Sequence, residues 1–321
     1  MKIEIPNQNE ALAEAGRLAA ALGLELYAVG GCARDWLLGR PSDDVDFLVS
    51  GDPLPLARAF AGSGTITPFE KFRTVRAFTP DGRRFDFAGF RRETYPAPAK
   101  LPVVEPAGSL AEDLLRRDFT CNAMAVSLLP ASFGELADPH GGAADIKAGR
   151  LRVLHPLSFR DDPTRIYRCA RFAARFGWKP EAGTMTLIAE AVAAGMPGLL
   201  SVERLRNELI KILKEAKPAA ALDLLSGWKA LDFIYRGAGW SRLDAVSDWR
   251  ARLTYLAGLP GAGGEAFLKG LRLERTLSVP MIKALSLAAP AGDTRRHGVP
   301  AQYRDLEPFQ SEAISALREE K

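Results

Sequence analysis

Short apolar runs and alternating positions dominate the first part of the chain. Residues 26–29 and 45–49 are apolar runs of strand length. Residues 74–79 and 83–90 flank a Pro-Asp-Gly turn, which is typical of a β-hairpin. Upstream, residues 9–22 place leucine and alanine at helical spacing and predict an amphipathic helix. The first part therefore combines strands with helices.

Proline and serine mark three further segments of this part. A proline at the first turn predicts a helix at residues 53–61. Residues 93–108 are rich in proline and alanine, which favours a mobile loop. Ser109 has the features of an N-cap for a helix at residues 110–115, with Glu112 at the capping-box position. The pattern predicts a small mixed or antiparallel sheet with flanking helices.

Strand-like runs largely stop after residue 151. Asp162-Pro163 is a strong helix start and Gly177 a stop, with an apolar stripe at helical spacing between them. The fold class predicted from the pattern is α+β, with an α+β head followed by an all-helical remainder. Further helices are predicted at residues 184–194, 201–214 and 219–225, and the rest reads as helices broken by loops such as the glycine-rich run 258–264.

Composition changes this picture little. A chain of 321 residues is too long for one small core, so two or more domains are expected. The net charge of +4 weakly favours an anionic partner such as nucleic acid, although so small an excess is also compatible with no effect. The 3 cysteines are far apart, which disfavours a disulfide framework or a zinc site and fits a reducing cytoplasm. Neither a signal pattern nor a membrane-length apolar run is present, so secretion and membrane insertion are disfavoured.

The candidate chemistry lies between the first two predicted strands. Gly30 and Gly31 allow close backbone approach, and a helix beginning near Cys32 would direct its unpaired N–H groups at an anion. Asp44 and Asp46 are two apart on a strand, so both point to one face. Two adjacent carboxylates repel each other unless a cation sits between them. The pattern therefore predicts Mg²⁺ arriving with a nucleoside triphosphate.

A third carboxylate comes from the predicted hairpin. Asp86 stands between Phe85 and Phe87, so it faces away from both rings. If that face also bears Asp44 and Asp46, the three carboxylates converge. Acidic residues at the start of a strand are more often merely solvated, and this reading stands beside the metal-binding one.

Five sequence blocks resemble one family. GGCARDWLLGRPSDDVDF from Gly30, RRDFTCNAMA from Arg116, DPHGGAADI from Asp138, RDDPTRIYRCARFAARFG from Arg160 and SVERLRNEL from Ser201 are similar, in this order, to class II tRNA nucleotidyltransferases and bacterial poly(A) polymerases. The resemblance covers roughly the first two thirds of the chain. It implies a nucleotidyltransferase head at residues 1–150, a helical neck with a base-reading helix at 151–214, and a helical body and tail binding RNA at 215–321.

The resemblance also implies roles for single residues. It assigns two-metal catalysis to three carboxylates, and nucleotide binding to residues on both sides of the head–neck boundary. Asp35 is expected to orient Arg34 or the helix start. The metal ligands are Asp44, Asp46 and Asp86; the triphosphate is assigned to Gly30, Gly31 and Arg34, phosphate to Arg117, ribose to Asp118 and Asn122, the base to Asp162 and Arg165, and Arg168 is included as lining the site.

The base-reading pair has its own chemical logic. A carboxylate accepts from an exocyclic amine, and a guanidinium donates to the adjacent ring nitrogen. Cytosine and adenine offer this pattern, whereas uracil and guanine do not, so the pair would select CTP and ATP. One departure is Asp161, where the family pattern has glutamate. The alternative is that Asp162 only caps a helix and that the arginines after it form a solvated face.

Several functions remain open at this point. The resemblance favours an enzyme that adds CMP and AMP to the 3′ end of tRNA, with tRNA, CTP and ATP as partners and substrates. The Pro96–Pro106 segment is long enough for the mobile loop of complete CCA-adding relatives but poor in arginine, so addition of only CC or only A is also open. A bacterial poly(A) polymerase and an inactive RNA-binding relative are the alternatives. A dinucleotide-binding fold is disfavoured because no G-x-G-x-x-G follows.

Overall fold

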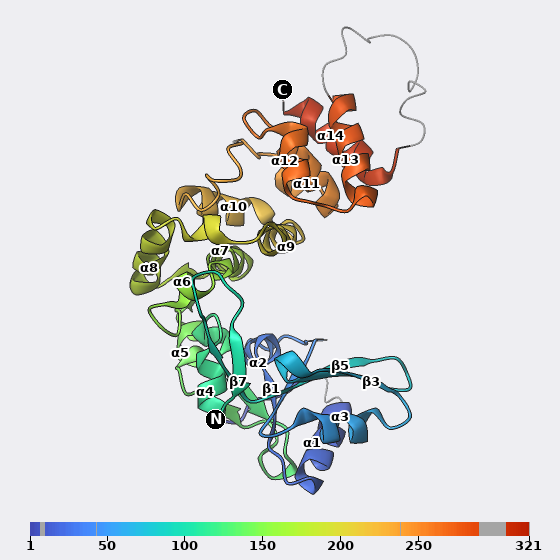
Figure 1. Ribbon diagram of the computed structural model, residues 1–321, viewed down its shortest axis with the longest axis vertical. Helices are drawn as coiled ribbons and strands as arrows, with labels where there is room; N and C mark the ends of the chain where they lie inside the picture. Colours follow the sequence, from blue (N-terminus) through green and yellow to red (C-terminus); the bar gives the residue numbers. More distant parts are fainter. Residues whose placement is uncertain (7–9, 43, 238, 289–305, 321) are drawn as a thin grey trace. The chain divides into compact units, whose positions relative to one another are not determined.

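The computed structural model describes residues 1–6, 10–42, 44–237, 239–288 and 306–320. These residues form two compact units (Figure 1). The first comprises Met1–Asp161 with Lys179–Thr184, and the second comprises Asp162–Trp178 with Met185–Lys321. The finer division into head, neck and body stays a prediction, and residues 289–305 of the predicted body lie outside the described ranges. The α+β class followed by helices is confirmed.

The first unit is built on a mixed seven-stranded sheet. Its strand order is β3-β4-β5-β2-β1-β8-β9. Strands β2 and β5 run parallel, while the other neighbours in this sheet run antiparallel. Strands β3, β8 and β9 have no counterpart among the predicted strands. The strands are β1 (Leu26–Val29), β2 (Asp46–Val49), β3 (Thr65–Phe69), β4 (Thr74–Phe78), β5 (Arg84–Gly89), β8 (Ala125–Ser127) and β9 (Leu136–Ala137).

Helices α1 (Glu10–Ala21) and α3 (Pro53–Ala61) cover one face of this sheet, and α2 (Gly31–Leu37) lies on the other (Figure 1). The predicted start of the first helix at residue 9 lies outside the described residues. On the α3 face, the Phe47 ring lies 4.7 Å from that of Phe87 between centroids, and Phe60 meets Phe85 edge-on at 4.9 Å. Such ring pairs contribute about 0.5–1.5 kcal/mol each beyond their burial. Because side chains alternate along a strand, this cluster sends Asp86 to the opposite face.

One sequence prediction is wrong in this unit. Residues 93–108, predicted as a loop, contain most of a two-stranded antiparallel ribbon. Arg92 and Glu105 are partners across it, with Nε and Oε2 3.0 Å apart. The paired ends are formed by charged and β-branched residues, and the prolines lie at Pro106 and in the connecting turn. The ribbon consists of β6 (Arg91–Thr94) and β7 (Val103–Pro106).

The remaining elements of the first unit are short. Ser109 caps α4 by accepting from the Glu112 N–H at 3.3 Å, which confirms the predicted N-cap. The Glu112 carboxylate accepts from Gly108 rather than from Ser109, so the predicted capping box is only half formed. These elements are η1 (Glu70–Phe72), α4 (Leu110–Leu115), η2 (Thr120–Asn122), η3 (Pro130–Ser132), α5 (Gly142–Lys147), β10 (Arg150–Leu151), α6 (Ser158–Asp161) and β11 (Lys179–Pro180).

The second unit is helical throughout its described residues. Gly177 ends α7 at φ 68°, as the sequence predicts, and Ser201 caps α9 through the Arg204 N–H. Helix α8 begins in the first unit and continues into the second. The elements are α7 (Thr164–Phe176), α8 (Ala182–Ala193), η4 (Met196–Leu199), α9 (Val202–Leu213), α10 (Pro218–Gly227), η5 (Leu243–Ala245), α11 (Trp249–Gly258), α12 (Gly264–Gly270), α13 (Arg275–Ala288) and α14 (Pro308–Glu319).

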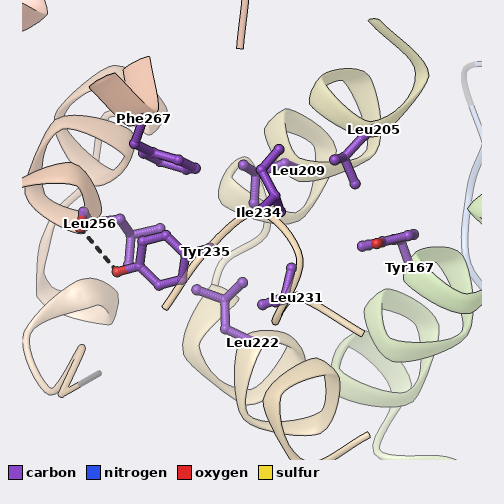
Figure 2. A pocket seen from close by; sticks show the side chains of 9 residues that line it. All are labelled: Tyr167, Leu205, Leu209, Leu222, Leu231, Ile234, Tyr235, Leu256 and Phe267. Carbon is purple, nitrogen blue, oxygen red and sulfur yellow. Dashed lines mark hydrogen bonds between the residues drawn. The ribbon is translucent and has the colours of Figure 1, made fainter. Parts of the chain in front are cut away.

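An apolar pocket lies inside this second unit (Figure 2). The two tyrosine hydroxyls at its wall are engaged: Tyr235 donates to the Leu256 carbonyl at 3.0 Å and Tyr167 to the Ala230 carbonyl at 2.8 Å. The pocket thus offers apolar packing rather than polar recognition. Among the described helices, none is both long and apolar enough to cross a bilayer. The pocket is lined by Tyr167, Leu205, Leu209, Leu222, Leu231, Ile234, Tyr235, Leu256 and Phe267.

Candidate active site

The Gly-Gly turn joins β1 to α2. Gly30 has φ 79° and ψ −124°, a conformation that is strained for residues with a Cβ. A Cβ at Gly30 would lie 3.1 Å from Arg117 Nη1, and one at Gly31 would lie 3.5 Å from Arg34 Nη2. Two guanidinium groups therefore lie against the two glycines. Backbone and positive charge meet here, as the sequence predicts for a phosphate site.

Arg34 anchors a buried polar chain. Its guanidinium donates to both Asp35 oxygens at 2.9 and 3.0 Å, which confirms that Asp35 orients Arg34. Arg34 Nη1 also donates to Asn122 Oδ1 at 2.6 Å, and Asn122 Nδ2 donates to Asp118 Oδ1 at 3.0 Å. Asp118 Oδ1 further accepts from the Phe119 N–H at 2.8 Å. The residues predicted to hold the triphosphate and the ribose are thus joined in one hydrogen-bonded chain.

The predicted metal ligands lie on adjacent strands. Asp46 on β2 is the register partner of Asp86 on β5, so both carboxylates share one face. Asp86 accepts from Arg76 Nε and Nη2 at 2.8 and 3.2 Å. Arg84 lies 3.5 Å from Asp44 and 3.8 Å from Asp86. Two arginines thus accompany the carboxylates in this structure.

The charge of Asp46 is disfavoured in the folded protein. Its pKa is raised, first by desolvation among the surrounding protein atoms and next by the charge of Asp44, while Arg117 lowers it and Asp86 raises it further. The side chain nevertheless keeps contact with solvent. Crowded carboxylate oxygens of this kind suit a divalent cation. No set of three His, Cys, Asp or Glu within the described ranges is arranged to hold a metal ion, so metal binding by Asp44, Asp46 and Asp86 stays a prediction.

Asp113 on α4 is an important residue that the sequence reading missed. Its side chain is fully buried and accepts from the Arg91 N–H at 3.1 Å, from Arg116 Nη2 at 3.0 Å and from Arg117 Nη2 at 3.2 Å. Arginines follow it at the i+3 and i+4 positions, a spacing that places all three side chains on one helix face. This spacing is visible in the sequence and could have identified Asp113, but the aspartate lies before the block RRDFTCNAMA that resembles the family.

The predicted base readers Asp162 and Arg165, together with Arg168, belong to the second unit, whereas the other nine predicted site residues belong to the first. Asp162 Oδ1 accepts from the Thr164 N–H at 2.9 Å and from Arg204 Nη2 at 2.7 Å. Asp162 therefore caps the backbone N–H at the start of helix α7. Arg165 is buried, and the Arg168 guanidinium lies 5.3 Å from the centre of the Phe172 ring. Reading of the base by these residues stays a prediction.

Arginines against a Gly-Gly turn and carboxylates paired on adjacent strands are the arrangement expected of a nucleotidyltransferase head, and comparison with known proteins agrees. Residues 26–152 match the Poly A polymerase head domain. An A-adding tRNA nucleotidyltransferase of Aquifex aeolicus is 42% identical over 239 residues, which are 71% of this chain and 29% of that protein. The chain thus spans less than a third of that relative's length.

Two solved structures are similar over nearly the whole chain. The apo form II of a CCA-adding enzyme has a TM-score of 0.80 and 31% identity, covering 98% of this chain and 80% of that one. A tRNA nucleotidyltransferase complexed with a primer tRNA and an incoming ATP analogue has a TM-score of 0.77 and 31% identity, covering 96% and 94%. This chain belongs to the tRNA nucleotidyltransferase and poly(A) polymerase family. That family generally uses divalent metal ions.

Proposed function

We propose that this protein adds CMP, AMP or both from CTP and ATP to the 3′ end of tRNA without a nucleic-acid template, and that it acts in the cytoplasm. The observation that carries the proposal is that Arg34 and Arg117 lie against the Gly-Gly turn while the charge of Arg117 acts on Asp46, the register partner of Asp86. Similarity to CCA-adding and A-adding enzymes supports the choice of reaction. The reaction forms a bond from the terminal 3′ oxygen to the α-phosphorus and releases pyrophosphate.

Asp44, Asp46 and Asp86 are proposed to hold Mg²⁺. When bound, two such ions supply a lowered pKa for the attacking 3′-hydroxyl and charge neutralisation for the leaving pyrophosphate. The pKa of Asp46 is raised first by desolvation and next by the charge of Asp44, and this supports the assignment because a bound cation would stabilise the charged carboxylates. Arg76 lies 2.8 Å from Asp86 and Arg84 lies 3.5 Å from Asp44, so a bound cation would compete with these arginines for the carboxylates.

The remaining polar residues are proposed to hold and read the nucleotide. Arg34 and Arg117 would bind the triphosphate beside Gly30 by charge-assisted hydrogen bonds. Asp118 would accept from the ribose 2′-hydroxyl, with Asn122 keeping the carboxylate in place. These roles divide phosphate binding from sugar recognition within the same hydrogen-bonded chain.

Asp162 and Arg165 are proposed to read the base. The hydrogen bonds that Thr164 and Arg204 donate to the Asp162 carboxylate engage Oδ1. Its capping role and a base contact through Oδ2 are therefore compatible. The pair would accept cytosine and adenine because only these bases present an amine beside an accepting ring nitrogen.

The test is incorporation on defined primers. Purified protein is incubated with Mg²⁺ and labelled CTP or ATP, using tRNA transcripts that end before the first C, after C and after CC. Addition of all three nucleotides identifies CCA synthesis, whereas labelling only by ATP on the CC-ended transcript identifies A addition, which the Aquifex aeolicus relative favours. Long runs of A on an unrelated RNA would identify a poly(A) polymerase and contradict the tRNA-specific reading.

The carboxylate assignment is tested in the same assay. Asp44→Ala and Asp46→Ala should abolish incorporation while the variants keep a cooperative thermal unfolding transition and an unchanged circular dichroism spectrum. Retained incorporation in either variant would contradict its role as a metal ligand. Asp81→Ala is the matched control, because Asp81 is an exposed carboxylate in the same unit that pairs with Arg83.

A further inference from the structure

Asp113 is the central anion of an arginine cluster. Its buried carboxylate contacts the side chains of Arg116 and Arg117 and the backbone N–H of Arg91. The three arginines lie within each other's electrostatic field: the pKa of Arg91 is lowered, first by burial and next by the charge of Arg116. Like charges brought this close separate unless an anion lies between them. The fully buried Asp113 carboxylate, which accepts hydrogen bonds from charged donors, can supply this negative charge.

Arg117 depends on the Asp113 carboxylate more than Arg116 does. Its Nη2 bonds to Asp113, its Nη1 lies beside Gly30, and its Nε is buried without a hydrogen-bond partner. Arg116 has a second anchor, since its Nη1 donates to Glu93 at 2.9 Å. Loss of the Asp113 charge would therefore leave Arg116 held by Glu93 while it released Arg117.

We propose that Asp113 is a positioning residue that holds the Arg117 guanidinium against Gly30, so that it is preorganised to meet the nucleotide phosphates. This inference rests on the proposed function and adds a residue to it. Asp113 itself is enclosed by protein and does not touch the nucleotide. Its contribution is to remove the ordering cost of a long side chain before the nucleotide arrives.

The first test is a double-mutant cycle in nucleotide binding. Asp113→Asn keeps the shape of the side chain but removes its charge, and Arg117→Gln removes the guanidinium. The dissociation constants of ATP and CTP are measured with Mg²⁺, together with KM and kcat for incorporation. Each single variant should weaken binding about tenfold, and the double variant should be no weaker than Arg117→Gln alone, because both act through one group. KM should rise more than kcat falls.

Glu93→Gln is the matched control, because it removes the other anchor of Arg116 and leaves the anchor of Arg117 in place. Its nucleotide affinity should stay within about twofold of the wild type. Additive losses in the double variant, or an equal loss in Glu93→Gln, would overturn the inference and leave Asp113 as a residue that supports only folding. Thermal unfolding of every variant checks that the comparison uses folded protein.

A second measurement does not depend on nucleotide. Relaxation of the Arg117 ¹⁵Nε–H signal, assigned with Arg117→Lys, reports the mobility of the guanidinium in the ligand-free protein. It should be rigid in the wild type and mobile in Asp113→Asn. Equal rigidity in both would overturn the inference. A wild-type protein that binds no nucleotide, combined with release of Arg117 in the variant, would instead contradict the proposed function.

Discussion

Replacing Gly30 by alanine tests the phosphate site through its backbone. The change forces a Cβ into φ 79°, ψ −124°, which costs about 1–3 kcal/mol of stability. The new Cβ would also lie 3.1 Å from Arg117 Nη1, so the guanidinium must retreat by a few tenths of an ångström. Because a misplacement of about 1 Å can cost about a hundredfold in rate, this retreat should lower kcat/KM about three- to tenfold.

Gly62→Ala is a closely matched control for this variant. Gly62 ends α3 in the same unit at φ 56° and ψ −116°, nearly the conformation of Gly30. Nothing lies within 4 Å of the Cβ that alanine would add there. The two variants should therefore lose similar amounts of stability, about 1–3 kcal/mol each, because they share the backbone strain. They should differ in activity, because only one of them displaces an arginine.

The assay combines urea unfolding with single-nucleotide incorporation. Unfolding gives the stability of each variant, and incorporation under varied CTP or ATP gives kcat/KM. An equal loss of kcat/KM in Gly62→Ala would show that strain in the head, rather than the position of Arg117, controls activity. A Gly30→Ala variant within about twofold of wild-type kcat/KM would refute the placement of the triphosphate at this turn.

Three further changes probe the fold and the charge of the site. Gly16→Ala would place a Cβ 1.8 Å from the Leu128 carbonyl oxygen, so α1 must move away. Urea unfolding should show that the free energy of unfolding falls by about 3 kcal/mol or more, and a fall below about 1 kcal/mol would contradict this packing. Asp46→Asn removes a carboxylate whose raised pKa makes its charged form less favourable in the folded than in the unfolded state. With chelator present, its Tm should exceed that of the wild type at neutral pH, and the gain should disappear as the pH falls towards about 3.9; an equal gain at both pH values would contradict this cause. Tyr167→Phe removes the donor to the Ala230 carbonyl and should cost about 1 kcal/mol in the same unfolding assay, whereas no change would show that water replaces the hydroxyl.

Local patterns in the sequence were sufficient to predict the position of several helices and strands. The strand at residues 26–29 and the helix at 53–61 have the predicted bounds, because apolar runs and a proline at the first turn act within a few residues. The Asp35 partner of Arg34 was also expected, since the two are adjacent. The ribbon at β6 and β7 was missed because its proline and alanine content outweighed the alternation at its paired ends.

The sequence by itself determined the α+β head, the helical remainder, the Gly-Gly turn and the alternation that puts Asp86 opposite two phenylalanines. Only the tertiary structure decided which strands pair, and hence that Asp46 and Asp86 share a register. It also decided that Arg117 lies against Gly30 and that Asp113 anchors it. Asp113 and Arg117 are only four residues apart, but Asp46 and Asp86, like Arg117 and Gly30, are far apart in the chain. No local propensity specifies such a contact, because its free energy arises only when burial has brought the charged groups together.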